Sequence, residues 1–91
     1  MHVIVVYDVG LERLDAVRHV LKKYLNWIQN SVFEGEITLG KLEELKIFLL
    51  HVINKDKDSI IVFSINNPKW INKMIWGIEK DQQKIYYSQH L

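Results

Sequence analysis

Asp8 is the side chain whose chemistry decides what this chain can do. It follows the apolar run Val3 to Tyr7, and in an extended strand it shares a face with Ile4 and Val6. An ionised carboxylate at the end of an apolar run needs a cation, a hydrogen-bond donor or water. Asp8 is therefore either a functional charge or a structural aspartate whose oxygens accept backbone N–H groups ahead of a helix. Spacing alone favours the structural role, since structural carboxylates outnumber catalytic ones.

Arg13, Arg18 and Lys22 are the candidate phosphate contacts. A rotation of about 100° per residue places the two arginines at opposite edges of the apolar stripe of a helix, with the lysine on its exposed side. Residues 1–25 carry four Lys or Arg against three acidic residues, whereas residues 34–58 carry four against six. Clustered basic side chains commonly contact phosphate, and an ordinary solvated helix face is the alternative.

The run Gln29 to Phe33 brings polar groups to the start of an apolar strand. The Ser31 hydroxyl and the two preceding amides can position a phosphate or the aspartate, and Phe33 is expected to pack. A nucleophilic serine needs a base within hydrogen-bond reach, and no Ser-His-Asp arrangement can be inferred, so covalent catalysis is rejected.

The remaining ionisable residues show no metal-ligand spacing. The histidines lack the i, i+4 pairing with a glutamate that marks a zinc site, and each is expected at the surface: His2, His19, His51 and His90. Glu34 and Glu36 are expected to face solvent or a dimer edge.

Apolar periodicity predicts the elements that position these groups. Strands are expected over residues 3–9, 59–65, 73–78 and 84–87, helices over 11–25 and 39–53, and one bent strand or a tight strand pair over 26–38. Lys55 to Asp58 is expected to be a solvated connection. The order βαββαβ with an extra tail strand predicts an α+β, ferredoxin-like two-layer sandwich in a single domain, residues 1–91. Such a sheet leaves one face open, which Trp76, Tyr86 and Tyr87 could cover, or these aromatic residues could cross to a partner.

Composition favours a soluble, cytoplasmic homodimer. A chain of 91 residues buries only about two-thirds of the surface that its unfolded form exposes, and 48% hydrophobic content suits an oligomer interface. The formal charge of +1 does not by itself indicate a nucleic-acid binder, so such a role needs a local patch. Cysteine is absent, which excludes disulfides and thiolate metal sites. The apolar opening is too short for a signal peptide or a membrane span.

Two segments together resemble a known family. Tyr7-Asp8-Val9 ends the first strand, a helix follows, and Gln29 to Gly35 reads Gln-Asn-Ser-Val-Phe-Glu-Gly. This arrangement resembles the small CRISPR-associated nuclease family that accompanies the integrase in spacer acquisition, part of prokaryotic antiviral defence. The resemblance is close over residues 1–37 and extends to the rest only in pattern.

The resemblance implies a metal-dependent endonuclease acting on single-stranded RNA or double-stranded DNA. In that family the aspartate matching Asp8 comes from both protomers of a homodimer, faces its copy across the dimer axis and can hold Mg²⁺ (or Mn²⁺). The tail strand joins the sheet of the other protomer, and the dimer binds integrase dimers in a heterohexameric complex. Many members carry a basic residue where this chain has Trp27, which removes a donor that could stabilise the reacting phosphate.

Three functions from different classes remain open. The first is the endonuclease with Asp8 as metal ligand and catalytic residue. The second is a non-catalytic dimeric scaffold that bridges integrase dimers and holds duplex DNA along its basic edges, through Arg13, Arg18 and Lys22. The third is a regulatory module that binds a small molecule at a dimer interface, although no glycine-rich phosphate loop supports it.

Overall fold

The computed structural model describes residues 1–67, 69, 73–78, 80 and 88–90. The elements, in chain order, are β1 (His2–Asp8), α1 (Leu11–Lys22), β2 (Asn26–Gln29), β3 (Val32–Glu36), α2 (Leu39–Val52), β4 (Ser59–Ile65), β5 (Lys73–Ile75) and β6 (Ser88–His90).

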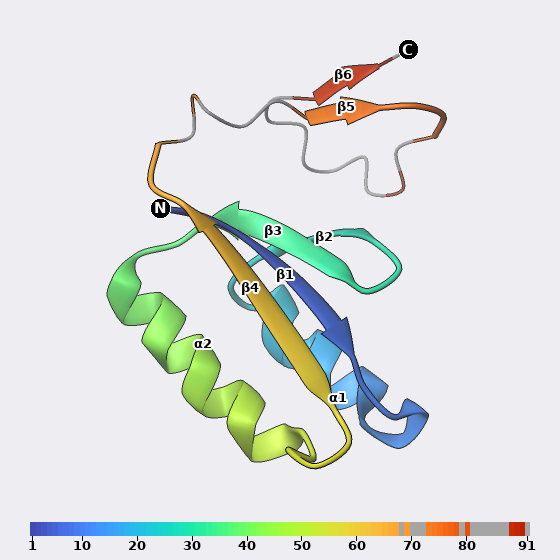
Figure 1. Ribbon diagram of the computed structural model, residues 1–91, viewed down its shortest axis with the longest axis vertical. Helices are drawn as coiled ribbons and strands as arrows, with labels where there is room; N and C mark the ends of the chain where they lie inside the picture. Colours follow the sequence, from blue (N-terminus) through green and yellow to red (C-terminus); the bar gives the residue numbers. More distant parts are fainter. Residues whose placement is uncertain (68, 70–72, 79, 81–87, 91) are drawn as a thin grey trace.

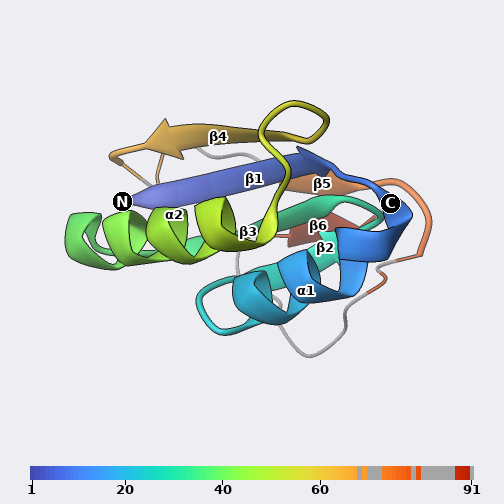
Figure 2. The same ribbon diagram turned by 90° about the horizontal axis from the view of Figure 1, so that it is seen from below.

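The main sheet is antiparallel, with strand order β2-β3-β1-β4. Both helices lie on the same side of this sheet, and the opposite face carries no helix (Figures 1 and 2). The central position of β1 and the order β1-α1-β2-β3-α2-β4 along the chain are those of the ferredoxin-like sandwich. The predicted fold class is confirmed.

The core lies between the sheet and the helices because side chains alternate along β1. Val3, Val5 and Tyr7 point toward the helices and are 0%, 0% and 2% exposed. Phe33 of β3 lies opposite Val5, is also fully buried, and its ring centroid is 6.1 Å from that of Tyr7. The helices contribute their inward residues to the same cluster, namely Val17, Leu21, Leu45 and Leu49. The predictions that Tyr7 and Phe33 pack in the core are confirmed.

Both helices end slightly before their predicted limits. After Lys22, the chain tightens into a turn in which Lys23 and Tyr24 donate to the carbonyls three residues earlier, so apolar periodicity continues to Leu25 while the α-helix does not. Helix α2 begins at a Thr38 cap, whose hydroxyl accepts from the Lys41 N–H at 3.2 Å. Its last residue is Val52, and Ile53 is extended.

Residues 26–36 form a strand pair rather than one bent strand. The pair reverses at Asn30, which has a positive φ of 42°, a conformation that asparagine tolerates better than most residues. A register shift between Trp27 and Gln29 adds a bulge to β2.

The tail forms a separate parallel strand pair, β5 with β6, which is not part of the main sheet (Figure 1). The predicted strand over residues 73–78 is shortened to Lys73–Ile75, and Gly77 follows with a φ of 113° that an L side chain rarely adopts. The strand predicted over residues 84–87, and Tyr86 and Tyr87 within it, lie outside the described residues.

Phe33→Ala should lower the free energy of unfolding by about 3–5 kcal/mol, because it removes a fully buried ring and leaves a cavity. Phe48→Ala is the matched control, since Phe48 is 48% exposed on α2, and its cost should stay below about 1–2 kcal/mol. Urea denaturation of both variants measures the difference. Equal losses would contradict the placement of the core.

Candidate functional site

Asp8 lies at the carboxyl end of the central strand, on the face without helices. The strand alternation that buries Tyr7 turns the Asp8 side chain to the opposite face, where it is exposed. Helix α1 has Gly10 at its N-cap position and no side-chain cap. Within the described residues, no hydrogen bond or ion pair engages the Asp8 carboxylate. The structure therefore does not use Asp8 as a helix cap.

The open face beside Asp8 is apolar. Ile4 and Val6 of β1 pair directly with Phe63 and Ile61 of β4, and these two β4 side chains are 55% and 50% exposed. An apolar surface of this kind, which ends in a carboxylate, is seldom left exposed to water and suits contact with another chain. At the other side of this face, a cavity of about 320 Å³ lies between the sheet and residues 74–78. Trp76 in that segment is 77% exposed and does not close the open face.

On the helix side of the sheet, a hydrogen-bond network holds the carboxyl end of β1 in place. The Arg18 Nε donates to the Tyr7 hydroxyl at 3.0 Å, and that hydroxyl donates to the carbonyl of Asn30 at 3.2 Å. The indole Nε1 of Trp27 donates to the same carbonyl at 3.1 Å. The Tyr7 backbone N–H donates to the carbonyl of Ser31 at 3.0 Å. These bonds hold the turn that contains Ser31 against the end of β1, at the residue that directly precedes Asp8.

The predicted basic residues divide between two environments. Arg18 belongs to the network around Tyr7, and Lys22 is exposed one helical turn further along α1. Arg13 instead points toward the other edge of α1, where its Nη2 donates to Asp58 Oδ1 at 2.8 Å and its Nε donates to Oδ2. Because its guanidinium also pairs with Glu12 at 2.7 Å, Arg13 has little donor capacity left for phosphate.

Asp58 corrects the expectation that residues 55–58 are only a solvated connection. Its side chain is fully buried and accepts from the backbone N–H of Gly10 at 3.0 Å and of Asn54 at 2.8 Å. The hydrogen bonds from Arg13 hold the pKa of Asp58 well below its usual range, and the same bonds raise the pKa of Arg13. Through this ion pair the β1–α1 loop, which follows Asp8, is joined to the α2–β4 loop.

His2 and Glu34 are the other departures from the sequence-based expectations. His2 is fully buried rather than exposed, with Nε2 at 3.2 Å from Glu34 Oε2 and Nδ1 at 3.3 Å from Glu36 Oε1. Glu34 is 5% exposed: it pairs with Ile4 of β1 and lines the cavity that lies against residues 74–78. Periodicity does not signal this pair, since its partners are 32 residues apart. His19 and His51 are exposed as predicted, and the His90 side chain lies outside the described residues.

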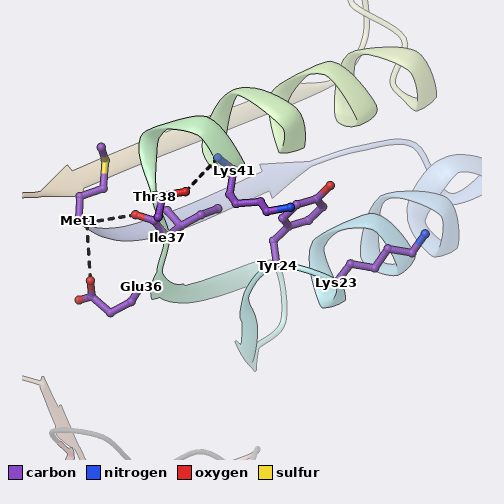
Figure 3. Close-up of a pocket in the computed structure, with 7 residues that line it drawn as sticks. All are labelled: Met1, Lys23, Tyr24, Glu36, Ile37, Thr38 and Lys41. Atoms are coloured by element: carbon purple, nitrogen blue, oxygen red, sulfur yellow. Dashed lines mark hydrogen bonds and ion pairs between the residues drawn. The ribbon is translucent and has the colours of Figure 1, made fainter.

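A cavity of about 470 Å³ lies at the far end of β1 from Asp8 (Figure 3). Figure 3 shows Tyr24 and Lys41 on one side of it and Met1 and Glu36 on the other, with the cavity also lined by Lys23. Two of its charged groups have local partners, since Lys41 pairs with Glu44 at 3.1 Å and the Met1 amine donates to the Ile37 carbonyl at 3.0 Å. Asp8 is not among the residues that line this cavity.

A metal site in one chain would rest on Asp8 alone. Among the described residues, no group of three or more His, Asp or Glu side chains could hold a metal ion. A carboxylate is the ligand type that Mg²⁺ and Mn²⁺ prefer, and a second copy facing the open side would supply a second one. The residues present fit such an ion only across a symmetric pair.

A membrane-spanning helix needs about 20 mostly apolar residues, and neither α1 nor α2, the two described helices, contains such a stretch.

Asp58→Asn should lower the midpoint of thermal unfolding at pH 7, because it leaves Arg13 without its anionic partner. An aspartate whose folded-state pKa is depressed stabilises the fold above its unfolded pKa of about 4 and loses that contribution as the pH falls. The wild type should therefore lose stability below about pH 4, and the variant should show a flatter dependence there. Asp56→Asn, an exposed change in the same loop, is the control. Parallel acid profiles for Asp58→Asn and wild type would contradict this role.

Comparison with known proteins identifies the family. The family model for CRISPR associated protein Cas2 matches residues 1–74. The CRISPR-associated endoribonuclease Cas2 3 of Thermodesulfovibrio yellowstonii is 50% identical over 80 residues, which cover 88% of this chain and 91% of the relative. The CRISPR-associated endoribonuclease Cas2 of Pyrococcus furiosus is 46% identical over 81 residues, covering 89% and 93%.

Solved structures agree with the sequence relatives. A crystal structure of a Cas2 protein superposes with a TM-score of 0.80 at 40% identity and covers 94% of this chain and 97% of that one. Streptococcus pyogenes Cas2 gives a TM-score of 0.68 at 33% identity, covering 76% and 92%. With the matching fold and sequence, the chain belongs to the Cas2 family of CRISPR-associated proteins.

Proposed function

We propose that this chain is a homodimeric component of CRISPR spacer acquisition that cleaves phosphodiester bonds, with Asp8 of two protomers as the metal-binding and catalytic carboxylates. The observation that carries the proposal is the exposed Asp8 carboxylate at the end of the central strand, beside an apolar open face. The names of the relatives, which are CRISPR-associated endoribonucleases, support the reaction type.

The open face is the surface on which the dimer is proposed. Two copies packed through Ile61, Phe63 and their β1 neighbours would bury the apolar surface that a single chain leaves in water. A two-fold axis near the end of β1 would bring the two Asp8 carboxylates together. Like charges at close range repel, and a hard divalent cation with oxygen ligands relieves that repulsion.

The proposed reaction is hydrolysis without a covalent enzyme intermediate. A water molecule loses a proton as its oxygen attacks the phosphorus, the bond from phosphorus to the leaving sugar oxygen breaks, and that oxygen takes up a proton from solvent. Mg²⁺ or Mn²⁺ held by the two Asp8 carboxylates would supply Lewis-acid stabilisation of phosphate charge and a more acidic water. Arg18 and Lys22, together with the Ser31 hydroxyl, are proposed to hold the substrate backbone through phosphate contacts.

A non-catalytic scaffold is the second candidate function. The resemblance implies a basic residue at the position of Trp27, and Arg13 is engaged by Asp58, so this chain has fewer free guanidinium groups near the site than the resemblance implies. A dimer with weak cleavage could still bridge integrase dimers and bind nucleic acid. The two functions differ in whether Asp8 is needed.

Asp8→Asn should reduce cleavage of end-labelled single-stranded RNA or double-stranded DNA in Mg²⁺ by at least about 100-fold, because it removes the charge that holds the cation. Binding of the same substrates, measured by electrophoretic mobility shift, should remain. Asp15→Asn on the exposed face of α1 is the control and should cleave like wild type.

The other outcomes separate the candidates. Equal cleavage by wild type and Asp8→Asn would reject Asp8 as a catalytic residue. Binding without cleavage in either protein, with or without metal, would leave the scaffold as the function.

A further inference from the structure

Trp27 and Arg18 are joined through a single hydrogen-bond chain on the helix side of the sheet. Both the Trp27 indole and the Tyr7 hydroxyl donate to the Asn30 carbonyl, and Arg18 donates to the Tyr7 hydroxyl. These groups come from β2, the β2–β3 turn, β1 and α1, so four segments fix the two side chains relative to each other. A flat ring and a guanidinium are thus held in place before any ligand arrives.

Each of the two side chains keeps surface and donors for a ligand. Trp27 packs against the core but is only partly buried, so the rest of its ring meets solvent. Arg18 is likewise half-buried and uses one of its five N–H donors, that on Nε, for Tyr7. In the part of the chain that the structure describes, no acceptor engages its two terminal nitrogens.

Lys22 extends the same surface along α1. It lies four residues after Arg18, which places the two side chains on one side of the helix, and it is exposed. Lys23, the next residue, turns by about 100° and lines the cavity near Met1 instead. A flat aromatic ring beside two cations is the arrangement that binds single strands, with bases stacked on the ring and phosphates held by the cations.

We propose that Trp27, Arg18 and Lys22 form a subsite for one unpaired nucleotide, with its base stacked on the Trp27 indole and its phosphate held by Arg18 and Lys22. The inference rests on the proposed function and names its substrate class as single-stranded nucleic acid. A base inside a duplex has no free face for the indole, whereas an unpaired base does. RNA and DNA single strands share this chemistry.

The subsite is separate from the carboxylate. Tyr7 and Asp8 point to opposite faces of the sheet, so Trp27 and Arg18 lie on the helix side and Asp8 on the open side. A strand bound at both places would pass the β2–β3 turn, where Ser31 is positioned. The subsite therefore sets affinity for unpaired nucleotides, and Asp8 sets cleavage.

The test follows quenching of Trp27 fluorescence in the Trp70→Phe, Trp76→Phe double variant, in which Trp27 is the remaining tryptophan. Titration with a twelve-nucleotide oligo(U) or oligo(dT) should quench the emission, because a stacked base quenches indole. Titration with a duplex of equal length should not. If neither single strand quenches the emission at concentrations where a mobility shift shows binding, the subsite is overturned.

Affinity measured by fluorescence anisotropy of labelled oligonucleotides gives the second readout. Trp27→Ala should weaken single-strand binding by about tenfold, and Trp27→Phe, which keeps a stacking ring, should stay within about threefold of wild type. Lys22→Ala should reduce the slope of log affinity against log salt concentration by the equivalent of about one phosphate contact, whereas Lys23→Ala should leave that slope unchanged. If Trp27→Ala fails to fold by circular dichroism, the quenching assay, which keeps Trp27, still decides.

These measurements reject the subsite and the Asp8 reaction separately. Unchanged single-strand affinity in Trp27→Ala, with cleavage still lost in Asp8→Asn, would reject the subsite alone. Equal weakening of single-strand and duplex binding in Trp27→Ala would also reject it, because stacking on an unpaired base predicts a selective loss.

Discussion

The two-residue alternation of β1 is the constraint on which the rest of the structure depends. Because neighbouring side chains of a strand point to opposite faces, Tyr7 and Asp8 cannot share an environment. Burial of Val3, Val5 and Tyr7 under the helices therefore forces Asp8 onto the open face. A shift of register by one residue would bury the carboxylate and expose the core, so packing itself fixes where the candidate catalytic group lies.

The surroundings of β1 turn this constraint into a rigid strand end. On one side, Tyr7 is held by Arg18 and by the turn at Asn30. On the other, the loop after Asp8 is anchored by the pairing of Arg13 with the buried Asp58. Both arginines predicted to contact phosphate thus also have structural partners. The hydrogen-bond donors of Arg13 are largely occupied by its partner, whereas Arg18 keeps terminal nitrogens that can donate to a ligand.

The fold could be predicted from the sequence because it depends on periodicity and order. The β-branched run of β1 and the apolar spacing of α1 and α2 are local signals, and their succession leaves few topologies. Asp8, Tyr7 and Phe33 could be placed for the same reason. The pairs His2–Glu34 and Arg13–Asp58 could not, because their members are 32 and 45 residues apart and no local pattern joins them. The parallel pairing of β5 with β6 is a long-range property of the same kind.

Two Asp8 carboxylates are proposed to meet across a two-fold axis and to hold one divalent cation. Binding of Mn²⁺ to the dimer tests this directly. The bound ion is measured as a decrease in the electron paramagnetic resonance signal of free Mn²⁺. We expect the wild type to bind one Mn²⁺ for every two chains and Asp8→Asn to lose that binding. Stoichiometric binding that persists in Asp8→Asn, or one ion for each chain, would contradict it.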